Sequence, residues 1–291
     1  MTPDILANAA VSGILLGGFY AVASLGLTIT FGLLEIPNVA HPTFMVLAAY
    51  CVALLSARGL DPVLSALAVA PVFYALGAAL YGAYHVAFER GGATSTLQSF
   101  TFFFGVALVV QVSMTLVFGV DLLSVEAAYI GRSLTLGPLT MPFRLMVPFG
   151  LGIATGVAMW LYLARTRTGL AIRAVAHDAQ ALRIVGRSPL AAKRHAFGLA
   201  MATAALAGGA LVVVTPVDPF SGTQYIGRTF AIVVLAGMGS VPGTIVAALL
   251  IGLLESLVVT FIGATWAPGV AFTALLGTLA LRPGGIFGIA R

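Results

Sequence analysis

The sequence predicts an all-α, polytopic membrane protein, and two observations carry this prediction. Hydrophobic residues make up 60% of the 291 residues and charged residues 8%, a composition outside the range of soluble domains. Eight runs of 20 to 30 residues contain no Asp, Glu, Lys or Arg: residues 5–34, 36–57, 62–88, 91–120, 145–164, 196–217, 229–254 and 256–281. A spanning helix needs about 20 apolar residues, so we expect eight or nine transmembrane segments in one domain, residues 1–291.

Residues 165–195 form a basic segment between two of these runs. The segment holds seven of the fourteen basic residues and a single acid, Asp178. An excess of Lys and Arg marks loops on the cytoplasmic side of a membrane. If the segment is cytoplasmic, alternation of the spans places ten basic residues inside and four outside. The sequence therefore predicts an external N-terminus, an internal C-terminus and an extracytoplasmic loop at residues 119–142. The four bases assigned to the outside are Arg58, Arg132, Arg144 and Arg228.

Helix signals lie inside the basic segment. Asp178 precedes residues 179–185 as a cap, and Gly186 follows them as a left-handed stop. Ser188 and Pro189 are then typical of the cap and first position of a second helix. A loop that only fixes the topology needs charge but no capped helix, so this pattern favours a docking element.

Two proline- or glycine-rich stretches interrupt the apolar runs. The first, residues 35–42, contains Pro37 and Pro42 and the polar residues Glu35, Asn38 and His41. It is either an ordinary interfacial turn or a broken helix that lines a cavity, because irregular backbone is tolerated in a membrane only where protein shields it or water meets it. The second stretch is residues 237–243. Paired interruptions in two halves of a chain indicate an internal repeat with a site at the interface of the halves.

Few residues offer chemistry of their own. The only lysine, Lys193, follows Ala192 rather than a glycine, so no phosphate-binding loop is present, and the four histidines have no metal-ligand spacing. An enzyme is therefore disfavoured. Glu255 lies in an apolar stretch, where an ionisable group implies a function or a specific partner. The alternatives for Glu255 are pairing with a helix end or a position near the membrane surface.

Several motifs, in order along the chain, resemble the permease subunits of the branched-chain amino-acid class of ABC importers. These are Gly17-Gly18-Phe19-Tyr20-Ala21 with Asn38-x-Ala40-His41, Thr168-Gly169-x4-Ala174 with Asp178-x3-Leu182-x3-Gly186, Gly237-x-Gly239-Ser240-x-Pro242-Gly243 with Gly252 and Glu255, and Arg282-Pro283-x-Gly285-Ile286-Phe287-Gly288. The resemblance implies a transport subunit without a cofactor. Its implied partners are two ATPase subunits, a second permease subunit, identical or homologous, and an extracytoplasmic solute-binding protein, all at a bacterial cytoplasmic membrane.

The resemblance and the residues together predict two functional sets. The expected ATPase-coupling residues are Thr168, Gly169, Arg173, Asp178, Leu182, Arg183, Ile184, Val185 and Gly186, with Leu182, Ile184 and Val185 as apolar contacts. The expected lining of the substrate path is Tyr20, Ser24, Glu35, Asn38, His41, Thr43, Ser240 and Glu255. Relatives in this class carry branched-chain amino acids, urea, short amides or organic acids. A secondary transporter or channel is the competing class, and Glu255 is nearly its only candidate for a coupling group.

One departure from the family pattern concerns the substrate. The family continues after the histidine with glycine and an acid, whereas Pro42 and Thr43 follow His41 here. Without that carboxylate an ammonium group is bound less well, which leaves room for neutral or acidic substrates. Glu35 could replace it, although six residues on a continuous helix would put Glu35 and His41 on opposite faces.

Overall fold

The computed structural model describes residues 3–91, 95–282 and 284–287. Pro283 and Gly288 of the last family motif, and Arg291, one of the ten basic residues assigned to the inside, lie outside the described residues.

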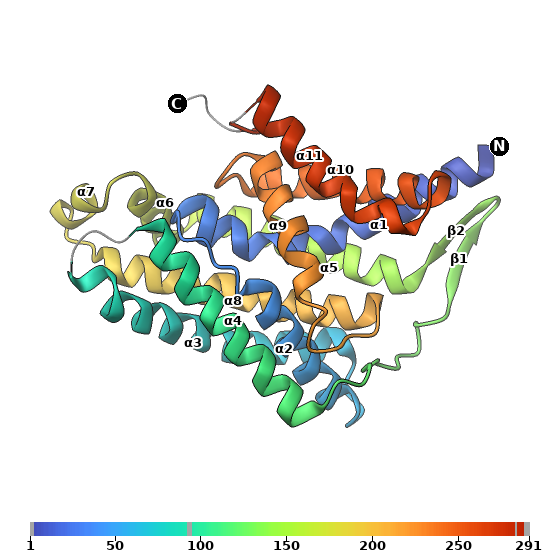
Figure 1. The fold of residues 1–291 in the computed structure, drawn as a ribbon, viewed down its shortest axis with the longest axis horizontal. Coiled ribbons are helices and arrows are strands. Elements are labelled where there is room, and N and C mark those ends of the chain that lie inside the picture. Colours follow the sequence, from blue (N-terminus) through green and yellow to red (C-terminus); the bar gives the residue numbers. More distant parts are fainter. Residues whose placement is uncertain (1–2, 92–94, 283, 288–291) are drawn as a thin grey trace.

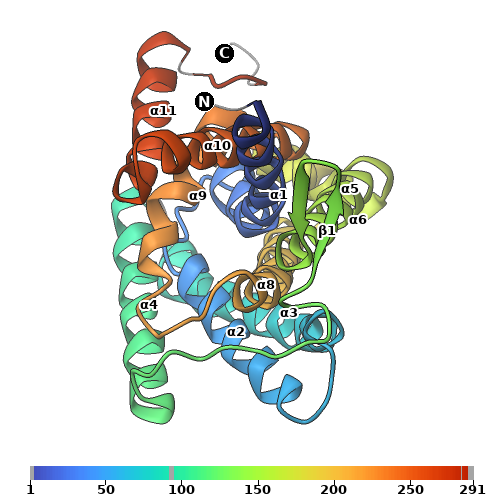
Figure 2. The same cartoon turned by 90° about the vertical axis from the view of Figure 1, so that its right-hand side faces the viewer.

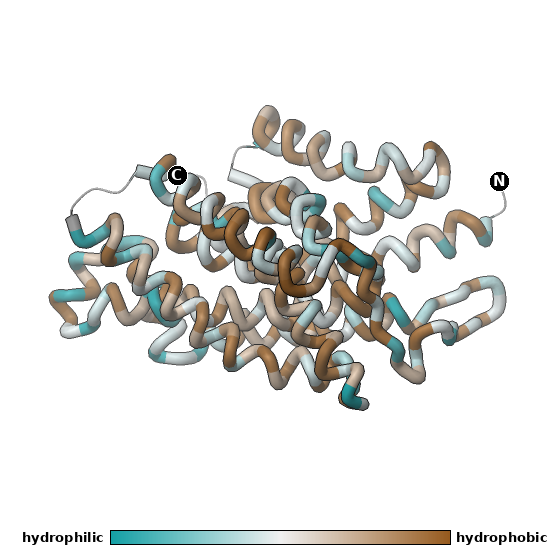
Figure 3. Tube along the Cα trace, turned by 60° about the horizontal axis from the view of Figure 1, so that its bottom comes forward, coloured by the Kyte–Doolittle hydropathy of each residue, from teal (hydrophilic) through white to brown (hydrophobic). Residues whose placement is uncertain are grey.

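Seven helices in the described residues are long and apolar enough to cross a membrane. They are α1 with its π-helical extension (Pro3–Leu33), α3 (Pro62–Ala87), α4 (Thr96–Phe118), α5 (Phe143–Arg165), α8 (Pro189–Val214), α10 (Val241–Phe261) and the short 3-10 turn with α11 (Ala264–Leu281). Figure 3 shows hydrophobic residues along these helices and hydrophilic ones gathered toward the ends of the bundle.

Two further helices, the apolar α2 (His41–Ser56) and the less apolar α9 (Thr223–Ala236), are shorter. Helix α2 has 16 residues and α9 has 14. At 1.5 Å per residue their lengths are ~24 Å and ~21 Å, less than the ~30 Å of a bilayer core. The predicted eight or nine apolar segments therefore resolve into seven long helices and two short ones, each next to one of the predicted breaks.

Helices α1 and α8 form the centre of the bundle. In their most apolar windows, 83% of α1 and 78% of α8 is buried, against 33% or less in the other five long helices. Figure 2, viewed along the bundle, shows α1 enclosed by α10, α5, α8 and α9. Glycines allow this packing: a Cβ added at Gly17 would lie 2.6 Å from Leu249 Cα on α10. Small residues thus let the backbones of α1 and α10 approach closely.

The loop at residues 119–142 contains the only β-sheet in the part of the chain that the structure describes. Strands β1 (Ser133–Leu136) and β2 (Leu139–Pro142) pair antiparallel around Gly137, whose φ is +62°. The sequence predicted only a loop here. The Asn8 side chain holds the hairpin, donating to Pro138 O (2.7 Å) and accepting from Thr140 N (2.8 Å). Figure 1 shows the hairpin at the end of the molecule that carries the N-terminus.

The basic segment lies at the opposite end (Figure 1). It consists of α6 (Arg167–His177), α7 (Ala179–Ile184) and the first turn of α8. The Asp178 carboxylate accepts from Gln180 N (2.7 Å) and Ala181 N (3.0 Å), Gly186 has φ +76°, and the Ser188 hydroxyl accepts from Ala191 N (3.3 Å). All three predicted caps are thus present. Helix α6 was not predicted.

Candidate functional site

The two chain breaks meet inside the bundle. Helix α1 continues as a π-helix, Thr28–Leu33, and the chain then turns at Glu35, whose φ is +58°. The second break turns at Gly237 and Gly239, with φ of +90° and +84°. A Cβ added at Gly32 would lie 2.4 Å from the backbone N of Gly239, so the breaks touch through glycine backbone. Residues 36–40 are all buried, so protein shields the irregular backbone of the first break.

Three buried side chains beside the first break keep polar atoms without partners. Ser24, Asn38 and His41 are each 0% exposed. Within the described residues, Ser24 Oγ, both amide atoms of Asn38 and His41 Nδ1 make no hydrogen bond, whereas His41 Nε2 lies 3.1 Å from Ala23 O. Burying unpartnered polar groups is costly. These three side chains, called the polar cluster below, are therefore closed off and incompletely satisfied.

The other predicted path residues are placed differently. Glu35 is exposed, and Thr43 is almost buried where the chain at Gly222 passes close to it. Ser240 caps α10, because its hydroxyl accepts from Gly243 N at 3.1 Å. The structure also brings together two hydroxyls that sequence analysis missed: Thr28 Oγ1 and Thr244 Oγ1 lie 2.7 Å apart and join α1 to α10 beside the breaks.

Glu255 has a specific partner inside the bundle. Its carboxylate is 2.9 Å from Arg228 Nε and accepts from the Tyr20 hydroxyl at 2.5 Å. Glu255 is 2% exposed, and the Arg228 guanidinium also lies 5.7 Å from the centre of the Tyr225 ring. The sequence analysis had counted Arg228 among the outside charges and had named no residue as the partner of Glu255. In this conformation Tyr20 and Glu255 are both buried and bonded to each other. Arg228 precedes the second break and Glu255 follows it, at similar distances along the chain. Two such residues lie opposite each other in a helical hairpin that turns at the break, so this spacing could have predicted their pairing.

The expected coupling residues divide into an exposed set and a buried set. Ile184 and Val185 are 87% and 72% exposed, and Arg173, Asp178 and Arg183 are exposed as well. Leu182 is only 5% exposed and belongs to the hydrophobic core of this chain. The expectation that Leu182 contacts a partner is thereby corrected, because on a short helix its side chain points to the opposite side from Ile184.

Thr168 and Gly169 connect α6 to the long helices. A Cβ added at Gly169 would lie 2.3 Å from Tyr162 O of α5, so only glycine fits there. The Thr168 hydroxyl is 2.6 Å from Tyr162 Oη, and Tyr162 Oη is 2.5 Å from Nε2 of His195 on α8. The other ring nitrogen of His195 bonds Tyr74 of α3. A hydrogen-bonded chain thus ties the basic segment to three spans.

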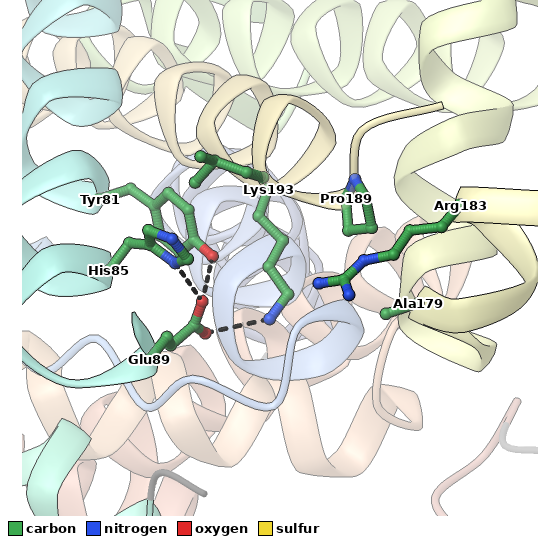
Figure 4. A pocket seen from close by; sticks show the side chains of 8 residues that line it. Tyr81, His85, Glu89, Ala179, Arg183, Pro189 and Lys193 are labelled. Atoms are coloured by element: carbon green, nitrogen blue, oxygen red, sulfur yellow. Dashed lines mark hydrogen bonds and ion pairs between the residues drawn. The ribbon is translucent and has the colours of Figure 1, made fainter. Parts of the chain in front are cut away.

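A cavity of about 380 Å³ lies at the same end, between α3, α7 and α8 (Figure 4). In it the Glu89 carboxylate accepts from Tyr81 (2.6 Å), is 3.1 Å from His85 Nδ1 and pairs with Lys193 (3.0 Å). Burial raises the pKa of Glu89, but these three hydrogen bonds and the Lys193 charge outweigh it and hold the pKa below its usual value. The carboxylate is therefore ionised at neutral pH. The sequence analysis did not identify Glu89 as a candidate functional residue.

Comparison with known proteins adds the family. The family model described as "Branched-chain amino acid transport system / permease component" matches residues 9–280. The permease BraD of Pseudomonas aeruginosa is 26% identical over 96% of this chain and 94% of its own length. The permease LivH of Escherichia coli K12 is 24% identical over 95% and 94%, and a probable LivH of Methanocaldococcus jannaschii is 23% identical over 95% and 90%.

Among solved structures, PsaBC from Streptococcus pneumoniae in complex with Fab is 14% identical, with a TM-score of 0.47 over 97% of this chain and 94% of that one. The family match covers almost the whole chain and agrees with its apolar helices. This multi-pass membrane protein belongs to the family of branched-chain amino-acid transport permeases.

Proposed function

We propose that this chain is the membrane-spanning subunit of an ATP-driven importer in a bacterial cytoplasmic membrane. Its substrates are branched-chain amino acids or related small amides and organic acids. The observation that carries the proposal is the family match over residues 9–280, joined to a capped helix with exposed apolar residues at the basic end. Two ATPase subunits dock at that end, a second permease subunit completes the membrane part, and a solute-binding protein delivers substrate at the hairpin end. The N-terminus is external and the C-terminus internal.

The substrate path passes the meeting point of the two breaks. Support comes from Ser24, Asn38 and His41, whose unpartnered atoms are what a small polar substrate or water would satisfy. The present conformation is closed, since all three are fully buried. Position 43 is a threonine here, where the family pattern has an acid. Hydrogen bonds without a fixed charge select weakly among small solutes, so we expect a substrate range wider than one amino acid.

Transport assays in proteoliposomes test the proposal. The chain is reconstituted with its ATPase and solute-binding partners, and uptake of radiolabelled leucine is measured with other small amides and organic acids as competitors. Uptake is expected to require ATP and to resist ionophores. Uptake that persists without ATP and collapses with ionophores would instead identify a secondary transporter.

Ile184→Asp is expected to reduce ATP-driven uptake at least about tenfold while the protein still folds. Its side chain is exposed, so the charge costs little in the free subunit, but a carboxylate in an apolar docking contact removes ~1.4 kcal/mol or more of binding energy. Uptake and ATPase co-purification are the measurements. Leu182→Asp is the contrast: it buries a charge in the core of the chain and should lower the yield of folded protein instead. Normal uptake by Ile184→Asp would contradict docking through this face.

Cysteine labelling tests whether the polar cluster opens. In a Cys51→Ser background, Asn38→Cys is expected to react with a water-soluble thiol reagent at least about tenfold faster during turnover than at rest, because its position is fully buried in the closed state. Leu136→Cys, at an exposed hairpin position, should react equally in both conditions. Ala66→Cys, at a buried position in α3, should stay unreactive. If Asn38→Cys never reacts, the first break has a packing role and does not line a substrate path.

A further inference from the structure

The cavity between α3, α7 and α8 contains more positive than negative charge. It is lined by Tyr81, His85, Glu89, Ala179, Arg183, Pro189, Leu190 and Lys193. Figure 4 shows the Lys193 ammonium and the Arg183 guanidinium converging on the cavity from α8 and α7. Glu89 is the only acid among the lining residues, so two permanent cations face one carboxylate.

The carboxylate is fully engaged, whereas the cations are not. Glu89 Oε1 bonds Lys193, and Oε2 bonds both Tyr81 and His85. Lys193 has three N–H donors, and one of them is used on Glu89. Within the described part of the chain, the Arg183 guanidinium makes no hydrogen bond or ion pair. The cavity therefore contains arginine and lysine N–H donors that are not used within the chain. A phosphate group has several oxygens that can accept hydrogen bonds from such donors.

The position of the cavity identifies the source of the phosphate. Tyr81 and His85 lie in the last two turns of the apolar helix α3, and Pro189, Leu190 and Lys193 in the first turns of α8. Both helices are long and apolar enough to span a membrane, so the cavity lies where a bilayer's headgroups would be. Basic pockets between spans at this level suit anionic lipid headgroups. A volume of about 380 Å³ falls within the roughly 300–1,000 Å³ of small-ligand pockets.

We propose that this cavity binds the phosphate-bearing headgroup of an anionic phospholipid, with Arg183 and Lys193 as its main ligands. The headgroup bridges α7 to α8 and so fixes the orientation of the segment that carries Ile184. This last consequence rests on the proposed function, since it concerns coupling to an ATPase. Lipid binding itself does not, because it requires only the cavity and a bilayer.

Lipid titration of the full chain tests the site. The delipidated protein in detergent is titrated with phosphatidylglycerol and, separately, phosphatidylcholine, and binding is followed by native mass spectrometry. The native chain is expected to prefer phosphatidylglycerol, and Arg183→Gln to bind it about tenfold more weakly because a charge-assisted contact is lost. Arg187→Gln is the matched control: it removes the same charge from an exposed position on the same segment that does not line the cavity, and it should change affinity less than twofold.

Three results would overturn the proposal. Equal weakening by Arg183→Gln and Arg187→Gln would mean diffuse attraction without a site. Absence of a preference for phosphatidylglycerol over phosphatidylcholine would exclude anionic lipid. Inorganic phosphate that binds as tightly as the lipid would assign the cavity to a free anion. Unchanged thermal unfolding of Arg183→Gln in phosphatidylcholine establishes that a loss of binding is not a loss of fold. All these readouts are independent of uptake, so a failure here is distinguishable from a failure of the importer assignment.

Discussion

Arg228→Gln is expected to lower the stability and the yield of folded protein more than the removal of an exposed charge. Glu255 is 2% exposed and 2.9 Å from Arg228 Nε. Removing the cation leaves a buried carboxylate whose one other side-chain partner, among the residues that the structure describes, is the Tyr20 hydroxyl. Breaking one side of a buried ion pair costs about 3–5 kcal/mol, a large share of the ~5–15 kcal/mol that stabilises a typical protein. Thermal unfolding and size-exclusion yield in detergent measure the effect.

Two further variants separate the effect of breaking the ion pair from the effect of removing a positive charge. Arg132→Gln removes an exposed arginine near the hairpin and should leave stability within ~0.5 kcal/mol. Adding Glu255→Gln to Arg228→Gln should recover much of the lost stability, because two neutral amides can replace the charged pair. A double variant no more stable than Arg228→Gln alone would show that Arg228 acts by packing on Tyr225 and not by neutralising Glu255.

Gly252→Val is the second change for which we expect a severe loss of folded protein. A Cβ at position 252 would lie 2.5 Å from Gly17 N and 2.6 Å from Gly13 O. These are backbone atoms of α1, the most buried helix of the bundle, so they cannot move aside as a side chain could. Overpacking a core typically costs about 1–3 kcal/mol, and forcing two long helices apart should reach or exceed the upper value. The measurement is again thermal unfolding together with the yield of monodisperse protein.

Gly105→Val is the matched control for this prediction. Gly105 lies within α4, and a Cβ there would meet nothing within 4 Å. Both variants place valine inside an apolar helix, so any effect of helix propensity is shared between them. Comparable losses in Gly105→Val and Gly252→Val would refute the proposed role of close contact between α1 and α10.

Local features of this protein were predictable because they depend on residues close together in the chain. The apolar runs, the two breaks, the Asp178 and Ser188 caps and the left-handed Gly186 each follow from neighbouring residues. A cap forms between groups two or three residues apart, so no knowledge of the tertiary fold is needed. The family resemblance also rests on motifs read in order along the sequence, and the family match over residues 9–280 confirms it.

The tertiary structure alone decided which side chains meet. Leu182 and Ile184 are both apolar and two residues apart, yet one enters the core and the other is 87% exposed, since packing against neighbouring helices decides which face of α7 is buried. Arg228 and Glu255 looked like an outside charge and an isolated acid until the hairpin of α9 and α10 brought them together. In apolar helices nearly every face is hydrophobic, so the helical pattern does not mark the buried side. Shape complementarity, through contacts such as Gly32 on Gly239, selects the partners instead.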